Sequence, residues 1–322
     1  MSIPNDTTKG YMRNTRRFAD AFNYLLYGGE QVIQPENLTV EDITEVLAFR
    51  GRDNKLVSAE RYRDILKEAE LMVDGEKRYL LLGIENQAAI HYAMPVRNML
   101  YDALNYAAQV SDIAKANKGD AGSGAEFLSG YQKKDHLAPL ITLVIYWSDG
   151  KWDGPRSIHE MLDIKDERLL EFIPDYKLNL IVPGEMKMEA FDKFSTELKD
   201  VLRFISVEGK RQRVAELMEH YGDRYSRLDK DSREVLEACT DVTFEYDSTT
   251  GRYNMCKAWD DQYKYGQEEG RKEGRAEGRR EEKKDTVLRL FDLGISIEKI
   301  SAGVEESEET VTNWLREAGK IQ

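Results

Sequence analysis

The feature that most constrains the fold is a pair of strand-like segments joined by the dipeptide Asp74–Gly75. Asp-Gly is among the strongest short signals for a two-residue β-hairpin turn. The second segment, Tyr79–Ile84, reads Tyr-Leu-Leu-Leu-Gly-Ile and is almost wholly apolar, which is typical of a central strand buried on both faces. The sequence therefore predicts a layered sheet with this hairpin near its centre.

The turn also predicts the register of the hairpin. If residues 74 and 75 form the turn, residue i of one arm faces residue 149 − i of the other, so Asp64 lies opposite Glu85 and on the same face. Gln87 follows two residues later and shares that face. The segment around Asp64, RYRDILKEAEL, is also rich in helix formers, and as a helix it would break this pairing. The strand and helix alternatives both stay open.

Other segments complete an order of helix, three strands, helix and strand. An amphipathic helix is expected over residues 13–27, ended by Gly28–Gly29, and a further helix is expected to open at Pro95. The remaining predicted elements are strands at 44–49, 140–147 and 178–182, a polar glycine-bearing loop at 113–135, and charged helices from about 186 to 240. This order predicts an α/β fold with a mixed sheet flanked by helices, followed by a helical C-terminal region.

Charge and composition limit the kinds of protein to which this sequence can belong. The 322 residues carry a net charge of −13, which argues against binding nucleic acid over the whole surface. Two local basic stretches, 9–19 and 50–63, are the candidate phosphate contacts. No apolar run is long enough to cross a membrane, and the polar N-terminal segment lacks signal-peptide character. With two cysteines, Cys239 and Cys256, these features predict a cytoplasmic protein without a disulfide framework.

The predicted pair of Asp64 and Glu85 points to metal chemistry. Two carboxylates that face each other are destabilising unless positive charge lies between them. Glu85 also interrupts an apolar strand, where a buried carboxylate needs a partner. Carboxylate oxygens with a neighbouring amide, here Gln87, suit a hard cation such as Mg²⁺. The alternative interpretation is a surface hairpin whose acids are simply hydrated.

A wider set of motifs resembles a known family. The segments FADAFNYLLYGGEQVI, YRDILKEAE, YLLLGIENQ and HYAMPVRNMLYDALNY resemble the recombination-promoting nuclease, or transposase-like, family of the PD-(D/E)XK nuclease superfamily. The resemblance covers roughly residues 13–260 and implies a restriction-endonuclease-like αβββαβ core, which agrees with the order of elements above. It also implies a Mg²⁺-dependent DNA endonuclease of low sequence specificity, with Mn²⁺ as a substitute metal.

The resemblance assigns roles to four residues. Asp64 and Glu85 correspond to the metal-binding acids, and Asp20 on the first helix corresponds to an upstream catalytic acid. Gln87 stands where the superfamily has a lysine that orients the attacking water. A glutamine holds a water but brings no charge, which implies weaker catalysis. The alternative function is therefore a catalytically weakened nuclease fold that acts as a DNA-binding or oligomeric assembly protein.

Basic residues near these acids are the candidate DNA contacts. Arg97 and Tyr101 lie one turn apart on the helix after the hairpin, and Arg97 is expected either to contact phosphate or to brace Glu85. The other candidates flank the acids in the chain and are Arg16, Arg17, Arg61 and Arg63. These side chains are predicted to grip the DNA backbone around the site.

The C-terminal region carries a glycine repeat. Four glycines recur at every fourth position, namely Gly266, Gly270, Gly274 and Gly278. On a helix they form a stripe with glutamates on one flank and arginines on the other. Such a stripe sacrifices about 0.8–1 kcal/mol of helix propensity per glycine, which the close approach of a second helix would offset. The repeat predicts parallel self-association, and a flexible charged linker is the alternative.

The chain is expected to divide into four regions. Residues 1–200 are predicted to form the nuclease-like domain, 201–260 a helical subdomain, 261–284 the glycine-repeat helix or linker, and 285–322 a small module resembling a helix-turn-helix. Acids at the start of the third helix of this module would repel phosphate, so it is predicted to pack or pair rather than to read the major groove. The expected partners are DNA and a second copy of the chain.

Overall fold

The computed structural model describes residues 3–40, 44–50, 56–62, 64–73, 76–120, 122–240, 242–249 and 252–321. The chain divides into two compact units, Met1–Met255 and Cys256–Gln322. The named strands all lie in the first unit, and the second unit is helical. Among the described residues, no helix combines the length and the apolar character needed to cross a membrane.

The first unit is built on a five-stranded mixed sheet. Its strand order is β1-β4-β5-β6-β7, in which β4 pairs antiparallel with β1 and β5, and β6 pairs parallel with β5 and β7. The strands are β1 (Leu38–Val40), β4 (Ile65–Val73), β5 (Glu76–Gln87), β6 (Leu140–Tyr146) and β7 (Asn179–Ile181). The predicted α/β class with a mixed sheet and flanking helices is confirmed.

The β4–β5 hairpin has the predicted register. Ile65 pairs with Ile84, and paired residue numbers sum to 149 along the whole ladder. The two predicted turn residues, 74 and 75, lie outside the described residues. The helix alternative for the segment after Asp64 is wrong, because pairing with the long apolar strand β5 overrides the local helix propensity.

Two predictions about the elements are corrected. The strand expected at 44–49 exists as β2 (Thr44–Arg50), but it pairs with β3 (Leu56–Tyr62) in a separate two-stranded ladder. The strand that pairs with β4 at this edge of the main sheet is instead β1, whose three residues are too few to produce a visible pattern. The loop expected at 113–135 contains the end of helix α3 and the short helix α4 (Gly124–Ser129).

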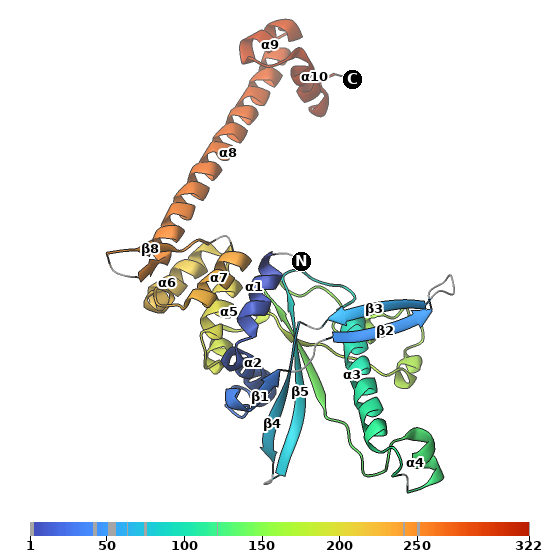
Figure 1. Cartoon of the computed structure of the whole chain (residues 1–322). Coiled ribbons are helices and arrows are strands. Elements are labelled where there is room, and N and C mark those ends of the chain that lie inside the picture. Colours follow the sequence, from blue (N-terminus) through green and yellow to red (C-terminus); the bar gives the residue numbers. More distant parts are fainter. Residues whose placement is uncertain are drawn as a thin grey trace. The chain divides into compact units, whose positions relative to one another are not determined.

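Helices cover both faces of the main sheet (Figure 1). Helix α3 (Met94–Ala116) lies on one face, and α1, α2 and α5 lie on the other. The remaining helices and strands of this unit are α1 (Ile3–Met12), α2 (Thr15–Tyr27), α5 (Leu198–Val207), α6 (Arg211–Tyr225), α7 (Lys230–Cys239), β8 (Glu245–Asp247) and β9 (Arg252–Asn254). As predicted, α2 ends at Gly28, which has a φ of 65°.

Successive side chains of β5 point alternately toward the layer of α3 and toward the layer of α1, α2 and α5. Leu81 packs with Leu66 and Leu140 beneath Tyr106 of α3, so this face of the sheet belongs to α3. Glu85 and Gln87 share that face, because side chains two residues apart on a strand point the same way. On the opposite face, the Lys67 ammonium lies 4.8 Å from the ring centre of Phe18 in α2.

The second unit consists of a long helix and a small module. Helix α8 (Met255–Asp292) contains the glycine repeat, so this region is a helix rather than a linker. The end of α8 packs with α9 (Ile297–Val304) and α10 (Glu308–Glu317) around a core made of Val287, Ile300, Val304, Val311, Trp314 and Leu315. Lys283 forms an ion pair with Glu306 at 2.7 Å, so one of the acids near the start of α10 has a cation within the module.

Candidate functional site

Two predicted acids meet at the end of the β4–β5 ladder. Asp64 directly precedes β4, and Glu85 lies near the carboxyl end of β5. The backbone N–H of Asp64 donates to Glu85 Oε1 at 3.4 Å, and the backbone N–H of Asn86 donates to Asp64 Oδ2 at 2.8 Å. The side chain of each acid is thus tied to the backbone of the other strand, as the hairpin register predicted.

A cationic side chain accompanies each carboxylate. Arg97 Nη2 lies 3.1 Å from Glu85 Oε2, and Arg97 Nε donates to the Tyr101 hydroxyl at 3.1 Å. Lys9 Nζ lies 3.9 Å from Asp64 Oδ1. Glu85 is fully buried, whereas the Arg97 side chain is 31% exposed, so the pair connects the interior to the surface. Of the two roles expected for Arg97, this geometry is that of a brace on Glu85.

The environment of Arg97 keeps its guanidinium charged. Burial alone lowers the pKa of Arg97, but the nearby Glu85 carboxylate and Tyr101 hydroxyl raise it, and the net shift is upward. The buried negative charge of Glu85 is therefore balanced by a fixed positive charge on α3. Tyr101 is itself buried and serves as the acceptor for Arg97, so it does not present a surface for DNA.

Gln87 lies at the end of β5 and is 8% exposed. Its backbone carbonyl accepts a hydrogen bond from the Trp147 N–H at 2.9 Å, which continues the β5–β6 pairing past the end of the sheet. Asn86 points to the opposite face, where its Oδ1 accepts from the Trp147 indole at 3.0 Å. By this alternation Gln87 shares the face of Glu85.

Asp20 does not join this pair. Its carboxylate is fully buried and accepts four hydrogen bonds, at 2.5 to 2.9 Å, from the backbone N–H groups and hydroxyls of Ser195 and Thr196. These donors lie in the segment that leads into α5, so Asp20 fastens α2 to α5. Among the described contacts none links Asp20 to Asp64 or Glu85, so the structure does not bring the predicted third acid into contact with this pair.

The predicted DNA contacts near Asp20 and Asp64 differ in exposure and in contacts in the structure. Arg17 is 4% exposed and forms ion pairs with Asp229 and with Asp231 of α7, so it ties α2 to α7. In this position it is buried and already paired, which does not agree with the predicted contact to phosphate. Arg16 is exposed beside it. Arg61 belongs to β3, but its side chain lies outside the described residues, as does the whole of Arg63.

The donor set at Asp64 and Glu85 suits a hard, hydrated cation. Within the described part of the chain, no group of three or more His, Cys, Asp or Glu side chains is placed to hold a metal. A metal here would therefore have two carboxylates as its charged ligands, with water completing its shell. Mg²⁺ is commonly bound in this way, because it dehydrates reluctantly and keeps several waters. The residues present fit Mg²⁺ or Mn²⁺.

Two polar residues near the site did not emerge from the sequence. Lys9 reaches Asp64 from α1, a helix that was not predicted because its sequence is mostly polar. The sequence marked Lys9 only as part of the basic stretch 9–19. Asn98, the neighbour of Arg97 on α3, is fully buried without a visible hydrogen-bond partner. No sequence pattern pointed to it, because α3 buries the face that carries Asn98 while the apolar Val96 and Met99 are exposed.

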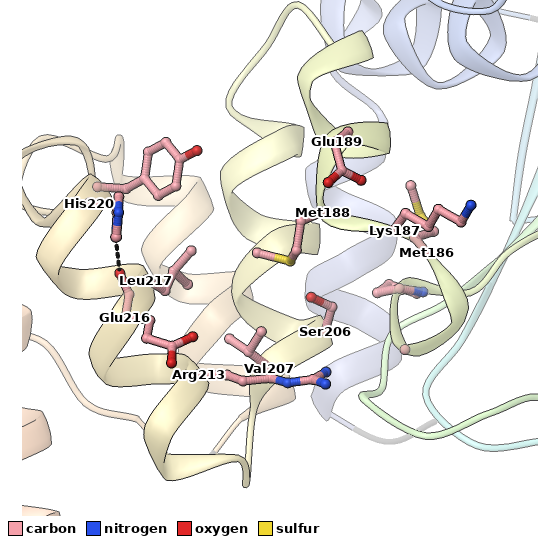
Figure 2. Close-up of a pocket in the computed structure, with 13 residues that line it drawn as sticks. Met186, Lys187, Met188, Glu189, Ser206, Val207, Arg213, Glu216, Leu217 and His220 are labelled. Atoms are coloured by element: carbon pink, nitrogen blue, oxygen red, sulfur yellow. Dashed lines mark hydrogen bonds between the residues drawn. The ribbon is translucent and has the colours of Figure 1, made fainter.

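A separate cavity of about 740 Å³ lies between α5, α6 and the segment 183–189 (Figure 2). His220 on its wall contacts the backbone carbonyl of Glu216 through Nδ1 at 2.8 Å, so Nδ1 carries the proton there. The cavity's charged side chains are Lys187, Glu189, Arg213 and Glu216, whose charges cancel. This cavity offers no pair of facing carboxylates and is not the site that the sequence predicted.

Comparison with known proteins adds no relative. No protein-family model, no characterised protein and no solved structure matches this chain. The grounds for a function are therefore the chemistry of the site and the layered α/β fold that positions it.

Proposed function

We propose that the chain is a cytoplasmic, metal-dependent DNA endonuclease of the PD-(D/E)XK type, like the recombination-promoting nucleases that its motifs resemble. The observation that carries the proposal is the pair of Asp64 and Glu85, two carboxylates on adjoining strands, with Lys9 and Arg97 beside them. Glu85 also lies at the carboxyl end of β5, where ligands of open α/β sheets commonly bind.

In this proposal Asp64 and Glu85 hold a Mg²⁺ or Mn²⁺ ion. When bound there, such an ion would polarise the scissile phosphate and lower the pKa of a water that it coordinates. Gln87, on the same face as Glu85, orients the attacking water through its amide. Arg97 keeps the Glu85 carboxylate in place through the 3.1 Å contact. The reaction is hydrolysis of a phosphodiester bond with low sequence specificity.

The DNA backbone is the proposed partner of the cationic side chains at the surface. Lys9 and Arg97 are partly exposed beside the two acids, and Arg16 is exposed near the start of α2. Phosphate contacts of this kind position a duplex without reading its sequence, which agrees with low specificity. Because the net charge of the chain is −13, binding is expected to depend on this local patch and to weaken with salt.

A second candidate function is favoured by Gln87. A neutral amide at the position of the expected lysine brings no positive charge to the transition state, so catalysis is weakened. The chain would then be a nuclease fold that binds DNA or serves as an assembly protein. Binding of DNA without cleavage in any metal would favour this candidate over the first.

Self-association through α8 is a further part of the proposal. Apart from the adjoining backbone of α8 itself, no described atom lies within 4 Å of a Cβ built on Gly274 or Gly278, so a second helix has room to approach this part of the stripe. Replacing Gly266, Gly270, Gly274 and Gly278 by alanine raises helix propensity and blocks close approach. Sedimentation analysis is expected to show a smaller assembly for this variant, and an unchanged assembly would contradict pairing through the stripe.

Nicking of supercoiled plasmid tests the nuclease proposal. Purified protein is incubated with Mg²⁺, with Mn²⁺ or with EDTA, and the Asp64→Ala and Glu85→Ala variants are assayed in parallel. Nicking that requires metal and is lost in both variants is the expected result. A wild-type protein that cuts in none of these conditions would contradict the nuclease proposal.

A further inference from the structure

Asn98 is a buried amide that the described structure leaves without a partner. The residue is 0% exposed, yet neither its Nδ2 nor its Oδ1 has a hydrogen-bond partner in the described part of the molecule. A buried amide with no partner lowers stability relative to an apolar side chain of the same shape. The presence of an asparagine here therefore calls for a ligand or a water that satisfies it.

The position of Asn98 on α3 places it over the sheet beside Glu85. Met94, one turn earlier, belongs to the same buried cluster as Val144, which is the register neighbour of Glu85 in β6. Asp102, one turn later, accepts a hydrogen bond from Thr142, the register neighbour of Gly83. Residues four apart lie on one helix face, so Asn98 faces the sheet between these two levels.

Its immediate neighbour in the chain already contacts the site. Arg97 reaches Glu85 Oε2 from the flank of the same helix face. Gly83, two residues before Glu85 on the same face of β5, has no side chain, so no side chain of β5 fills the space beneath α3 at that level. A polar group that is buried over a strand position with no side chain is a suitable place for an internal water.

We propose that Asn98 is a positioning residue for the proposed nuclease, and that its amide holds a buried water against Glu85. The amide donates through Nδ2 and accepts through Oδ1, so one water can bond to both Asn98 and the carboxylate. The water and Arg97 together hold Glu85 in one orientation toward Asp64. This inference rests on the proposed function, because it gives Asn98 a role in that same site.

Four variants test the role of Asn98. Asn98→Leu keeps the branched shape without polar atoms, and Asn98→Ser and Asn98→Ala form a pair of similar size that differs in one hydroxyl. Thr142→Val is the matched control, because it removes a buried polar group whose partner, Asp102, is known. Plasmid nicking gives kcat and KM, and thermal unfolding gives Tm.

The expected result separates activity from stability. Asn98→Leu is expected to lower kcat about tenfold or more, with KM within about twofold of the wild type. Loss of a group that orients a metal ligand typically lowers activity by about this factor. Its Tm stays the same or rises, whereas Thr142→Val lowers Tm. Asn98→Ser is expected to keep several times the kcat of Asn98→Ala, because its hydroxyl can still hold the water.

Two outcomes overturn the inference while leaving the nuclease in place. One is a kcat for Asn98→Leu within about twofold of the wild type, and the other is equal kcat for the serine and alanine variants. If the wild-type protein cuts no DNA, the nuclease proposal fails and Mn²⁺ affinity decides the role of Asn98. A weakening of about tenfold in Asn98→Leu would support it, and an unchanged affinity would overturn it.

Discussion

The two faces of the main sheet bury charged groups in different ways. On the side covered by α2, Asp20 of that helix accepts four hydrogen bonds from neutral donors of Ser195 and Thr196. Also on that side, the buried Lys67 donates to the backbone carbonyl of Arg13 at 2.8 Å, and burial lowers its pKa to about 8. These groups are enclosed, and their partners belong to the fold itself.

Beneath α3 the arrangement is open and charged. Glu85 is fully buried, but its partner Arg97 is partly exposed, and Asp64 beside it is paired with the partly exposed Lys9. A carboxylate held by neutral donors of the backbone serves stability, because removing it leaves those donors unsatisfied. In the proposed function, a carboxylate held by partly exposed cations exchanges them for a metal ion, and this difference distinguishes Asp20 from the proposed pair of Asp64 and Glu85.

The largest expected effect is on catalysis. Glu85→Gln keeps the shape of the side chain and an acceptor for Arg97, but it removes the charge that the metal requires. Plasmid nicking is expected to fall by about 10²–10³-fold. The variant should remain folded, which circular dichroism checks, and activity near that of the wild type would contradict the role of Glu85.

The same change at the other buried acid should act on stability. Asp20→Asn turns one acceptor oxygen into a donor that faces the donors of Ser195 and Thr196, and urea unfolding is expected to show a loss of about 2–4 kcal/mol. Nicking per folded molecule should be unchanged. A variant of normal stability that has lost nicking would return Asp20 to the catalytic site.

The enclosed face should also show its own pH dependence. Because the pKa of Lys67 is about 8 in the folded protein and 10.5 is its ordinary value, the unfolded chain holds one more proton between these pH values. Stability then rises as the pH rises from 8 toward 10.5. The free energy of unfolding relative to Lys67→Met should increase by about 2–3 kcal/mol across this window. Parallel pH profiles for the two proteins would contradict an enclosed Lys67.

The smallest expected effect concerns the brace. Arg97→Lys keeps the positive charge but loses the fork that contacts Glu85 and Tyr101 together. Nicking should fall by about tenfold, less than for Glu85→Gln, and the fold should persist. A loss as large as that of Glu85→Gln would mean that Arg97 contacts the reacting phosphate, which is the other role expected for it from the sequence.

The local part of the site was predictable, because a two-residue turn sets the register of the strands beside it. That rule placed Asp64 opposite Glu85, and the observed ladder follows it. The rule left strand and helix open at 65–73, where residue propensities also suit a helix, and the pairing with β5 in the structure is that of a strand. The apolar run Tyr79–Ile84 likewise predicted the strand β5, and the proline near the start of α3 predicted where that helix begins.

The long-range part was not predictable from local patterns. Asp20 was assigned to the site by the family resemblance and Arg17 by its basic stretch, yet their partners lie 175 to 214 positions away in the chain. Helix α1 carries Lys9 to Asp64 although its sequence is mostly polar. Such pairings depend on how α5 and α7 pack against α2, which no short-range periodicity encodes.

Calorimetric titration with Mn²⁺ tests the central claim most directly, because it reports on the carboxylate pair independently of DNA cleavage. The wild-type protein and Asp20→Asn are predicted to bind Mn²⁺ with similar affinity, whereas Asp64→Asn and Glu85→Gln are predicted to lose that binding. Binding that survives both of these changes, or that disappears in Asp20→Asn alone, would contradict the assignment of the metal site to Asp64 and Glu85.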